Sequence, residues 1–431
     1  MEDWNRVPIG SVAEVFDGPH ATPRTIDYGP IFLGIGALKN GRIDLGETRH
    51  VSLNDFAKWT RRVKPKPGDI VFSYETRLGE AAMIPEGLEC CLGRRMGLVR
   101  PLDERLDSRF FLYYYLSPEF QDFIRSRTIS GATVDRIALK EFPHFSIPLP
   151  DIGAQREIST LLGAIDDKIE LNRRMNETLE ASARALFRDW FVDFGPTRAK
   201  AEGRPAYLAP DLWSLFPDSF DGNDIPEGWQ LGTLNNFTDI QNGYAFSSKD
   251  WTDGGVPVVK IGSIKPGLVD LHQVSFISKE LAAERAAFRL VAGDMLVGLT
   301  GYVGETGFVP PTSSLPMLNQ RVGRIRPIVD AAAYIFCALR DPAFKEFAVS
   351  KSHGSAQANV STKSILQYPL PVPSDKIMKH FQNLTMPNFD QILLNHGESR
   401  TLAETRDTLL PKLMSGAIRV REAESAVAAL C

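Results

Sequence analysis

The chain has 431 residues, 43% of them hydrophobic and 24% charged, which is typical of a globular protein with two or three cores and excludes a disordered chain. No run of about 18 apolar residues could span a membrane, and the stretch MEDWNRVPIG lacks the basic and apolar regions of a secretion signal, so we expect a cytoplasmic protein without membrane contact. The net charge is −4. Residues 1–150 contain 20 basic and 20 acidic side chains, and residues 225–373 contain 13 basic and 12 acidic ones. This balance argues weakly against DNA binding, because a DNA-binding protein of this kind must gather its positive charge on one face.

Metal and disulfide sites are not expected. The four cysteines, Cys90, Cys91, Cys337 and Cys431, are too few and too scattered for a disulfide framework or a metal-binding knuckle. The seven histidines show no ligand spacing either. We therefore predict reduced structural thiols and no metal in this chain.

Residues 1–150 have the pattern of a β-rich α/β domain. The segments PIFLGIGAL and GDIVFS are short apolar runs with β-branched residues, bounded by Gly and Pro, which indicates strands. The segment DSRFFLYYYLSPEFQDFIRS has helical spacing. For Tyr113–Tyr115 within it we expect packing into a core and not stacking on a nucleic-acid base.

A long helix is predicted over residues 151–195. The stretch GAIDDKIELNRRMNETLEASARALFRDWF has no proline and, after its first residue, no glycine, and its apolar residues recur at helical spacing. The 37 residues of Gln155–Phe191 would extend over roughly 55 Å as a helix, far more than one small domain needs for its own core. Such a helix requires a partner.

The second half of the chain repeats the first. The block GDIVFSYETRLGEAAMIPEGLECCLGRRMGLVRP, residues 68–101, returns as GDMLVGLTGYVGETGFVPPTSSLPMLNQRVGRIRP, residues 293–327, and matching blocks precede and follow both. The repeat predicts a linker over residues 196–224 that docks through its aromatic side chains, a second β-rich domain over 225–373, a second long helix over 374–416, and a tail over 417–431 that returns toward residue 1.

The two long helices are expected to pair antiparallel, as a coiled coil about an internal pseudo-two-fold axis. Asn172 and Asn395 take matching positions near the middle of each helix, and an antiparallel pair brings them together. A buried Asn there would set the helix register, but two solvated side chains or contact with a third helix explain the pattern equally well. Pro387 and Gly397 are the places where a kink or a weakened contact is expected.

Catalytic motifs are absent from the sequence. It contains no P-loop for ATP, no Glu-x-Lys of the common metal-dependent nucleases, and no Asn/Asp-Pro-Pro-Tyr/Phe of adenine amino-methyltransferases. The glycines at positions 34, 36, 301, 304 and 307 form no complete dinucleotide fingerprint and are interpreted as turns. A chain of this size without a catalytic constellation is expected to be a recognition or scaffold subunit.

Four longer blocks stand out, and they occur in the chain as IPLPDIGAQREISTLLGAIDDKIELNRRMNETLEASARALFRDWFVDFGP, WQLGTLNNFTDIQNGYAFSSKDW, GSAQANVSTKSILQYPLPVP and TLLPKLMSGAIRV. In this order they resemble the specificity subunit of type I restriction-modification systems, and the resemblance covers nearly the whole chain. One departure is the segment Met378–His380, which stands where the first half has Gln155–Glu157.

The resemblance implies a mixed α+β fold of the α/β class: two β-rich target-recognition domains joined by two long antiparallel coiled-coil helices. Each domain would read one half of a split site on double-stranded DNA, and the helices would set the spacer between the halves. The implied partners are two methyltransferase subunits and restriction translocase-nuclease subunits. S-adenosylmethionine, ATP and Mg would bind to those partners and no cofactor to this chain, which would not be an enzyme.

Candidate DNA contacts lie in polar loops flanked by matching strands in each half. Base edges in the major groove are read by Arg, Lys, Asn and Gln, and phosphates are bound by Lys and Arg. For the first domain we select Arg77, Arg94, Arg95, Thr133, Arg136 and Lys140, and for the second Tyr302, Gln320, Arg321, Gln357, Asn359 and Lys363. The basic run Lys58, Arg61, Arg62 and Lys64 is expected to contact phosphates. A solvated surface position is the alternative for each charged residue, and Tyr302 could equally pack under a loop.

Two other functions remain open at this point. One is a coiled-coil scaffold whose end domains bind proteins, which would show no salt-dependent DNA binding. The other is an orphan or methylation-only specificity subunit, which the sequence of this chain does not distinguish from a restriction-competent one.

Overall fold

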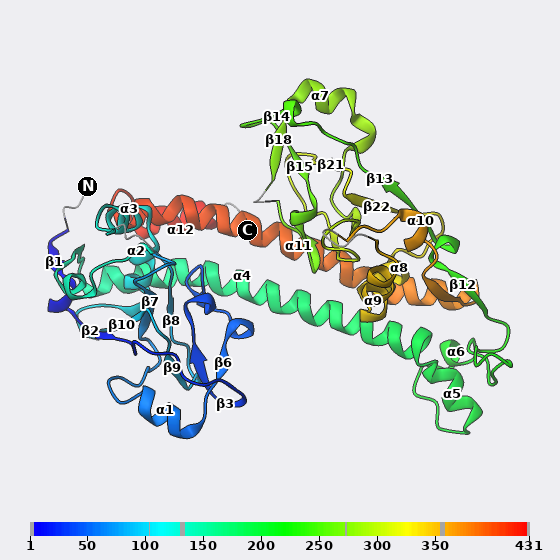
Figure 1. Ribbon diagram of the computed structural model, residues 1–431, viewed down its shortest axis with the longest axis horizontal. Coiled ribbons are helices and arrows are strands. Elements are labelled where there is room, and N and C mark those ends of the chain that lie inside the picture. Colours follow the sequence, from blue (N-terminus) through cyan, green and yellow to red (C-terminus); the bar gives the residue numbers. More distant parts are fainter. Residues whose placement is uncertain (1–3, 103, 130–133, 272–273, 354–357, 429–431) are drawn as a thin grey trace. The chain divides into compact units, whose positions relative to one another are not determined.

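The structure is a computed structural model that describes residues 4–102, 104–129, 134–271, 274–353 and 358–428 (Figure 1). The chain divides into two compact units, one of Met1–Ile169 with Thr401–Cys431 and the other of Glu170–Arg400. Each unit holds one β-rich domain and a segment of both long helices.

The first domain is built on two small sheets. Its strands are β1 (Arg6–Pro8), β2 (Ala13–Asp17), β3 (Ile26–Leu33), β4 (Leu38–Lys39), β5 (Arg42–Ile43), β6 (Arg49–His50), β7 (Ile70–Ser73), β8 (Ala81–Met83), β9 (Cys90–Leu92), β10 (Met96–Pro101) and β11 (Ser146–Pro148). An antiparallel sheet has the order β2-β10-β7-β8, and a second sheet has the order β6-β3-β9, in which β3 and β9 are parallel. The pairs β1-β11 and β4-β5 complete the domain.

The second domain repeats this topology. Its strands are β12 (Gln230–Thr233), β13 (Thr238–Asn242), β14 (Trp251–Thr252), β15 (Val256–Val259), β16 (Ile264–Lys265), β17 (Gly267–Val269), β18 (Ser275–Ile277), β19 (Met295–Gly298), β20 (Thr306–Phe308), β21 (Met317–Leu318), β22 (Val322–Pro327) and β23 (Pro369–Val372). The order β13-β22-β19-β20 matches β2-β10-β7-β8, and the parallel pair β15-β21 matches β3-β9. The internal repeat is therefore confirmed at the level of strand order.

Short helices cover the sheets: α1 (Leu53–Trp59), α2 (Ser108–Leu116) and α3 (Pro118–Ser126) in the first domain, and α7 (Lys279–Glu284), α8 (Ala332–Arg340), α9 (Pro342–Ser350) and α10 (Thr362–Ile365) in the second. The single helical stretch expected around Tyr113–Tyr115 is two helices, because Ser117 caps the second and Pro118 occupies its first turn. All three tyrosines are buried in the core, as predicted.

Both long helices are present and appear as unbroken ribbons in Figure 1. Helix α4 spans Ile152–Phe187 and continues as a π-helix over Arg188–Val192, and α11 spans Asp375–Met414. The Asp151 side chain accepts a hydrogen bond from the Ala154 N–H at 3.0 Å, as an N-cap does. The helix α11 runs on through Pro387 and Gly397, so these residues do not break it.

Within each unit the two helices pack on one another and on the domain. In the first unit Ile158 and Leu162 of α4 share a core with Leu409 of α11, and the Arg406 guanidinium lies 2.7 Å from the Asp166 carboxylate. In the second unit Phe187 packs against Phe381, with ring centroids 6.3 Å apart. The apolar stripe predicted from the heptads is thus the face that these helices bury.

A polar cluster of three buried asparagines, Asn172, Asn176 and Asn395, with the half-buried His396 interrupts the apolar contact in the second unit. Asn172 is fully buried and its amide donates to the Asn395 carbonyl at 3.4 Å and to Glu398 at 2.7 Å. The Asn395 amide donates in turn to Asn176 Oδ1 at 2.8 Å. The two helices run antiparallel here, since higher numbers on α4 face lower numbers on α11. The expected meeting of Asn172 and Asn395 occurs, and their role in setting register stays a prediction.

The linker and the tail both dock. The linker forms α5 (Gly195–Ala201) and α6 (Pro210–Trp213), and its Phe216 packs against Trp190 with ring centroids 5.1 Å apart. The tail forms α12 (Val420–Ala428), and Ala423 is buried in the same core as Ile9. The C-terminal segment therefore lies in the same unit as the N-terminal strand, as the repeat predicted.

The thiols Cys90, Cys91 and Cys337 are unbonded and buried, and burial raises the pKa of Cys90 and of Cys91 to about 12. Cys431 lies outside the described residues. In the part of the chain that the structure describes, no helix is both long and apolar enough to cross a lipid bilayer.

Candidate nucleic-acid interface

Three segments of the first domain meet where strand β7 ends. The Tyr74 N–H donates to the Arg95 carbonyl at 3.2 Å, and the Ile137 N–H donates to the Tyr74 carbonyl at 2.9 Å. A β-bridge joins Glu75 to Arg136. We call this meeting of residues 74–77, 94–95 and 134–140 the first junction. It brings together side chains that are up to 66 positions apart in the sequence, and it is held by backbone hydrogen bonds that do not depend on side-chain identity.

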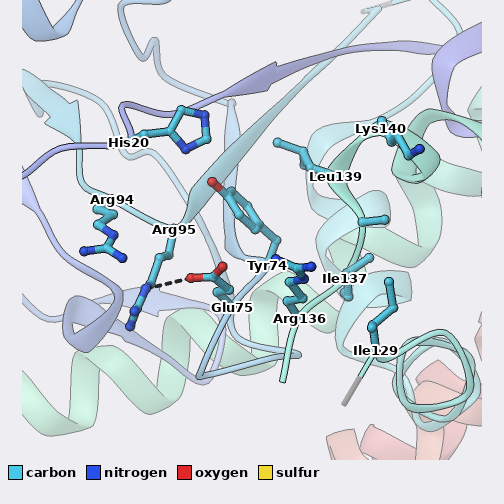
Figure 2. A pocket seen from close by; sticks show the side chains of 11 residues that line it. His20, Tyr74, Glu75, Arg94, Arg95, Ile129, Arg136, Ile137, Leu139 and Lys140 are labelled. Atoms are coloured by element: carbon cyan, nitrogen blue, oxygen red, sulfur yellow. Dashed lines mark ion pairs between the residues drawn. The ribbon is translucent and has the colours of Figure 1, made fainter. Parts of the chain in front are cut away.

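The first junction surrounds a cavity of about 580 Å³, shown in Figure 2. Arg94, Arg95, Arg136 and Lys140, all selected from the sequence, line it together with His20, Tyr74, Glu75, Ile129, Ile137, Ala138 and Leu139. In the view of Figure 2, Arg94 and Lys140 lie on opposite sides of the Tyr74 ring. Four of the six residues selected in this domain are therefore gathered around one recess.

The charges of the first junction divide into paired and unpaired groups. Arg95 Nε lies 2.7 Å from the Glu75 carboxylate, and its Nη1 donates to the Thr76 hydroxyl at 3.0 Å. The side chains of Arg94, Arg136 and Lys140 are exposed and have no hydrogen-bond or ion-pair partner among the described residues. Three cationic groups around the recess are thus available to an anionic or hydrogen-bonding ligand.

The backbone at the first junction is strained. Thr76 and Arg95 both have a positive φ, at 70° and 72°, a backbone conformation that residues other than glycine rarely adopt. In the second domain the residue that matches Thr76 is Gly301, with φ at 78°. The turn therefore requires a positive φ in both domains, and the first accepts the cost of a side chain there.

A second, smaller hollow of about 300 Å³ adjoins the first through His20. It is lined by Lys58, Arg61 and Arg62, three of the four residues of the basic run selected for phosphate contact. The fourth, Lys64, lies outside this lining and pairs with Glu89 at 2.6 Å. Between the two hollows the Asp17 carboxylate accepts from the Tyr74 hydroxyl at 3.1 Å and lies 2.7 Å from His20 Nε2. Burial, and then the charge of Asp17, raise the pKa of Tyr74, so its hydroxyl remains a neutral donor.

Arg77 has a structural position. Its Nη1 donates to the carbonyls of Ile35 and Gly36 at 3.2 and 3.1 Å, and its Nη2 lies 3.1 Å from Glu80. These bonds tie the end of the sheet to the turn that precedes β4. We therefore leave Arg77 out of the interface, a change from the sequence-based selection that follows from its occupied donors.

The second domain has an equivalent junction, which we call the second junction. The Leu299 N–H donates to the Arg321 carbonyl at 3.0 Å, the Val360 N–H donates to the Leu299 carbonyl at 2.9 Å, and a β-bridge joins Thr300 to Asn359. These contacts reproduce those of Tyr74, Arg95, Ile137, Glu75 and Arg136. The two junctions thus have the same backbone and different side chains.

The residues selected in the second domain are exposed at its junction. Gln320, Arg321, Asn359 and Lys363 are all exposed, and Tyr302 is 62% exposed, so its ring does not pack under a loop. The Thr300 hydroxyl donates to Asn359 Oδ1 at 2.7 Å. Thr133 and Gln357, the remaining two selected positions, lie outside the described residues.

Sequence reasoning missed His20, Glu75 and Thr300. Glu75 and Thr300 each lie two residues after the end of a buried strand, β7 or β19, in the repeated blocks 68–101 and 293–327. They differ between the halves, and this divergence at a matched strand end was the available signal. His20 carried no such signal, because only the folded chain brings the loop after β2 beside Tyr74. No group of three or more His, Cys, Asp and Glu that could hold a metal ion is found in the described ranges.

Comparison with known proteins gives the same assignment throughout the chain. Residues 1–181 and 226–396 each match the family model for the type I restriction modification DNA specificity domain. The HindI specificity subunit of Haemophilus influenzae is 25% identical over 97% of this chain and all of that protein, and the MjaIX specificity subunit of Methanocaldococcus jannaschii is 24% identical over 98% and 95%.

The fold has a solved counterpart. The crystal structure of the S subunit of a type I restriction-modification system from M. genitalium matches with a TM-score of 0.55 at 16% identity, over 95% of this chain and 96% of that one. Both halves of the chain, taken separately and together, agree on one assignment. The chain therefore belongs to the family of DNA specificity subunits of type I restriction-modification systems, and recognition of a DNA sequence is its function.

Proposed function

We propose that this chain reads a split, asymmetric site on double-stranded DNA, with the first junction on one half-site and the second junction on the other. The observation that carries this proposal is the repeated junction itself. Two copies of one backbone arrangement expose different polar side chains, which is what two readers of different sequences require.

The electrostatics of the first domain support DNA as the ligand despite the near-neutral charge of the domain. The unpaired Arg94, Arg136 and Lys140 lie around one recess, and Lys58, Arg61 and Arg62 line the adjoining hollow. The cationic side chains around the two hollows outnumber the acids that line them, Glu75 and Asp17, so positive charge is concentrated locally, as nucleic-acid binding requires. Arg94 and Arg136 at the recess would reach the bases, and Lys140 together with the groups of the adjoining hollow would bind phosphates.

The paired helices would hold the two readers at a set separation and so define the unread spacer between half-sites. The 36 residues of α4 extend over about 54 Å, which exceeds the 34–36 Å that separates half-sites one DNA turn apart. The buried hydrogen bonds of Asn172, Asn176 and Asn395 would keep the pair in one register.

The chain itself would carry out no chemistry. Partner subunits would supply it: two adenine-N6 methyltransferase subunits, which bind S-adenosylmethionine and flip the target adenine, and translocase-nuclease subunits, which use ATP and Mg. The exposed faces of the long helices would bind the methyltransferase subunits. We place the assembly in the cytoplasm, where chromosomal and invading DNA are both accessible.

A domain exchange tests the proposal. Residues 1–150 are replaced by the equivalent domain of another specificity subunit, and the sites bound by the assembled complex are selected from random duplexes. We expect one half-site to change and the other to stay. A change in both halves, or binding without sequence preference, would refute modular reading. A salt titration of wild-type binding supplies the control, because a scaffold that binds only proteins would show no salt-dependent affinity for duplex DNA.

A further inference from the structure

The two junctions allow a comparison of side chains at equal backbone positions. The matched pairs are Glu75 with Thr300, Arg95 with Arg321, Arg136 with Asn359, and Lys140 with Lys363. The first three pairings follow from bridges and hydrogen bonds that recur in both domains. Lys140 and Lys363 are matched because each lies three residues after the Ile137 or Val360 N–H that bonds to the junction. What differs between the domains at these positions is therefore the chemistry that each presents to its ligand.

In the first domain the carboxylate of Glu75 pairs with Arg95 and leaves Arg136 unpaired. The Glu75 carboxylate lies 2.7 Å from Arg95 Nε, and Arg95 also donates to Thr76, so the Arg95 guanidinium is held inside the junction. Arg136 lies on the bridge opposite Glu75, and its side chain is exposed without a partner in the described part of the chain. Arg136, like Arg94, is therefore a guanidinium of this junction that can turn toward a ligand, and it is the one that lies on the bridge that recurs in the second domain.

In the second domain a hydroxyl replaces that acid. The Thr300 hydroxyl donates to Asn359 Oδ1 at 2.7 Å, which restricts rotation of the exposed amide and leaves its two N–H donors and one acceptor lone pair unused. An amide held in this way has one acceptor and one donor side by side. The equivalent position thus presents a neutral donor-acceptor pair where the first domain presents a cation.

A comparison of the two domains distinguishes phosphate contacts, which should keep the same charge in both, from base contacts, which should differ. The DNA backbone has the same charge whatever the sequence, so a phosphate contact should be cationic in both readers. Lys140 and Lys363 meet this condition. Arg136 and Asn359 do not, because a phosphate contact would lose its charge attraction on changing from arginine to asparagine. Their difference is the one expected of base contacts.

We propose that Arg136 and Asn359 are equivalent specificity-determining residues, with Arg136 reading a guanine in one half-site and Asn359 reading an adenine in the other. The guanidinium donates two hydrogen bonds to guanine O6 and N7, and the amide accepts from adenine N6 and donates to N7. This inference rests on the proposed function, and it assigns a base to one position in each half-site.

The test uses the full chain assembled with its methyltransferase subunits and a pool of random duplexes from which bound sites are selected. Wild type defines the two half-sites, and the domain exchange assigns each to its domain. Arg136→Asn should lower affinity for the original site by about 5- to 150-fold and change one guanine of the first half-site to adenine, and Asn359→Arg should make the reverse change in the second. Arg136→Ala should relax that position without a new preference.

Two control variants separate the alternatives. Lys140→Ala should weaken binding to every sequence alike and reduce its salt dependence, and Arg125→Asn, on the exposed face of α3, should change nothing. A uniform loss for Arg136→Asn, or an unchanged half-site, would overturn the inference while the selected split site upholds the proposed function. A wild-type complex that selects no split site would overturn both. Assembly with the partner subunits and the midpoint of thermal unfolding show that each variant is folded.

Discussion

Replacing one asparagine of the helix cluster should destabilise the helix pair, and replacing its partner as well should restore most of the loss. Asn395 is 3% exposed, and its amide donates to Asn176 Oδ1, on a residue that is 8% exposed. The hydrogen bond between these two side chains is therefore buried with little access to water. Each side chain depends on the other for its hydrogen-bond partner.

The magnitude follows from the contacts. Asn395→Leu removes the hydrogen bond to Asn176, at about 1 kcal/mol, and leaves Asn176 Oδ1 buried without its donor, at about 1–3 kcal/mol. It also removes the acceptor of the Gln391 amide, which is exposed and can bond to water instead. Burial of the leucine offsets about 1.5 kcal/mol. The net cost is about 0.5–2.5 kcal/mol. In the double variant Asn176→Leu and Asn395→Leu no unpaired amide of this pair remains, so the two changes together should cost about 1–3 kcal/mol less than their sum.

Hydrogen exchange of the backbone amides in α4 and α11 measures this locally in the full chain. The free energy of opening around residues 172–179 and 388–399 should fall in each single variant and recover in the double variant. Asn383→Leu is the matched control: it removes an exposed amide of α11 that has no hydrogen-bond partner among the described residues, and it should have little effect. Strict additivity of the two single costs would refute the coupling. If the cluster also sets register, the double variant should accept a wider range of spacer lengths.

Three further outcomes follow from named contacts. Asp69→Asn should destabilise the first domain by about 3 kcal/mol in urea unfolding, because its 2% exposed carboxylate accepts from Arg100 Nε and Nη2 at 2.8 and 2.7 Å. The equivalent aspartate, Asp294, pairs at 2.7 Å with an arginine on another position of the strand, Arg324, so Asp294→Asn should act on the second domain. Equal loss in both domains from either change would contradict this. Gly97→Ala should lower the unfolding temperature of the first domain at a cost of about 1–3 kcal/mol, since a Cβ there would lie 2.5 Å from the Phe72 ring, whereas Gly34→Ala, with nothing within 4 Å, should be silent. Burial lowers the pKa of His396 below 6.5, so the unfolded state binds the proton more tightly, and the helix pair should open more easily as the pH falls below about 6.5. His396→Gln should flatten this pH dependence of the opening free energy, measured by hydrogen exchange. An unchanged slope would exclude His396 as its source.

The internal repeat and the two long helices could be read from the sequence. The block of residues 68–101 returns at residues 293–327 together with the blocks around it, and this repetition requires two domains of one topology. The absence of Gly and Pro from most of Gly163–Phe191 requires an uninterrupted helix. Both are properties of the local chain. The proline in α11 shows the limit of such rules, since a helix packed along its length tolerates a residue that an isolated helix would not.

The tertiary structure alone decided which side chains of the candidate interface are available. Sequence could select Arg77, Arg95 and Arg136 as one class, because composition does not reveal what a guanidinium will meet. In the folded chain Arg77 donates to backbone carbonyls, Arg95 pairs with Glu75, and Arg136 stays exposed. The physical reason is that a helix or strand depends on neighbours a few residues away, whereas the partner of a charged side chain is set by segments that the fold brings together from distant parts of the chain.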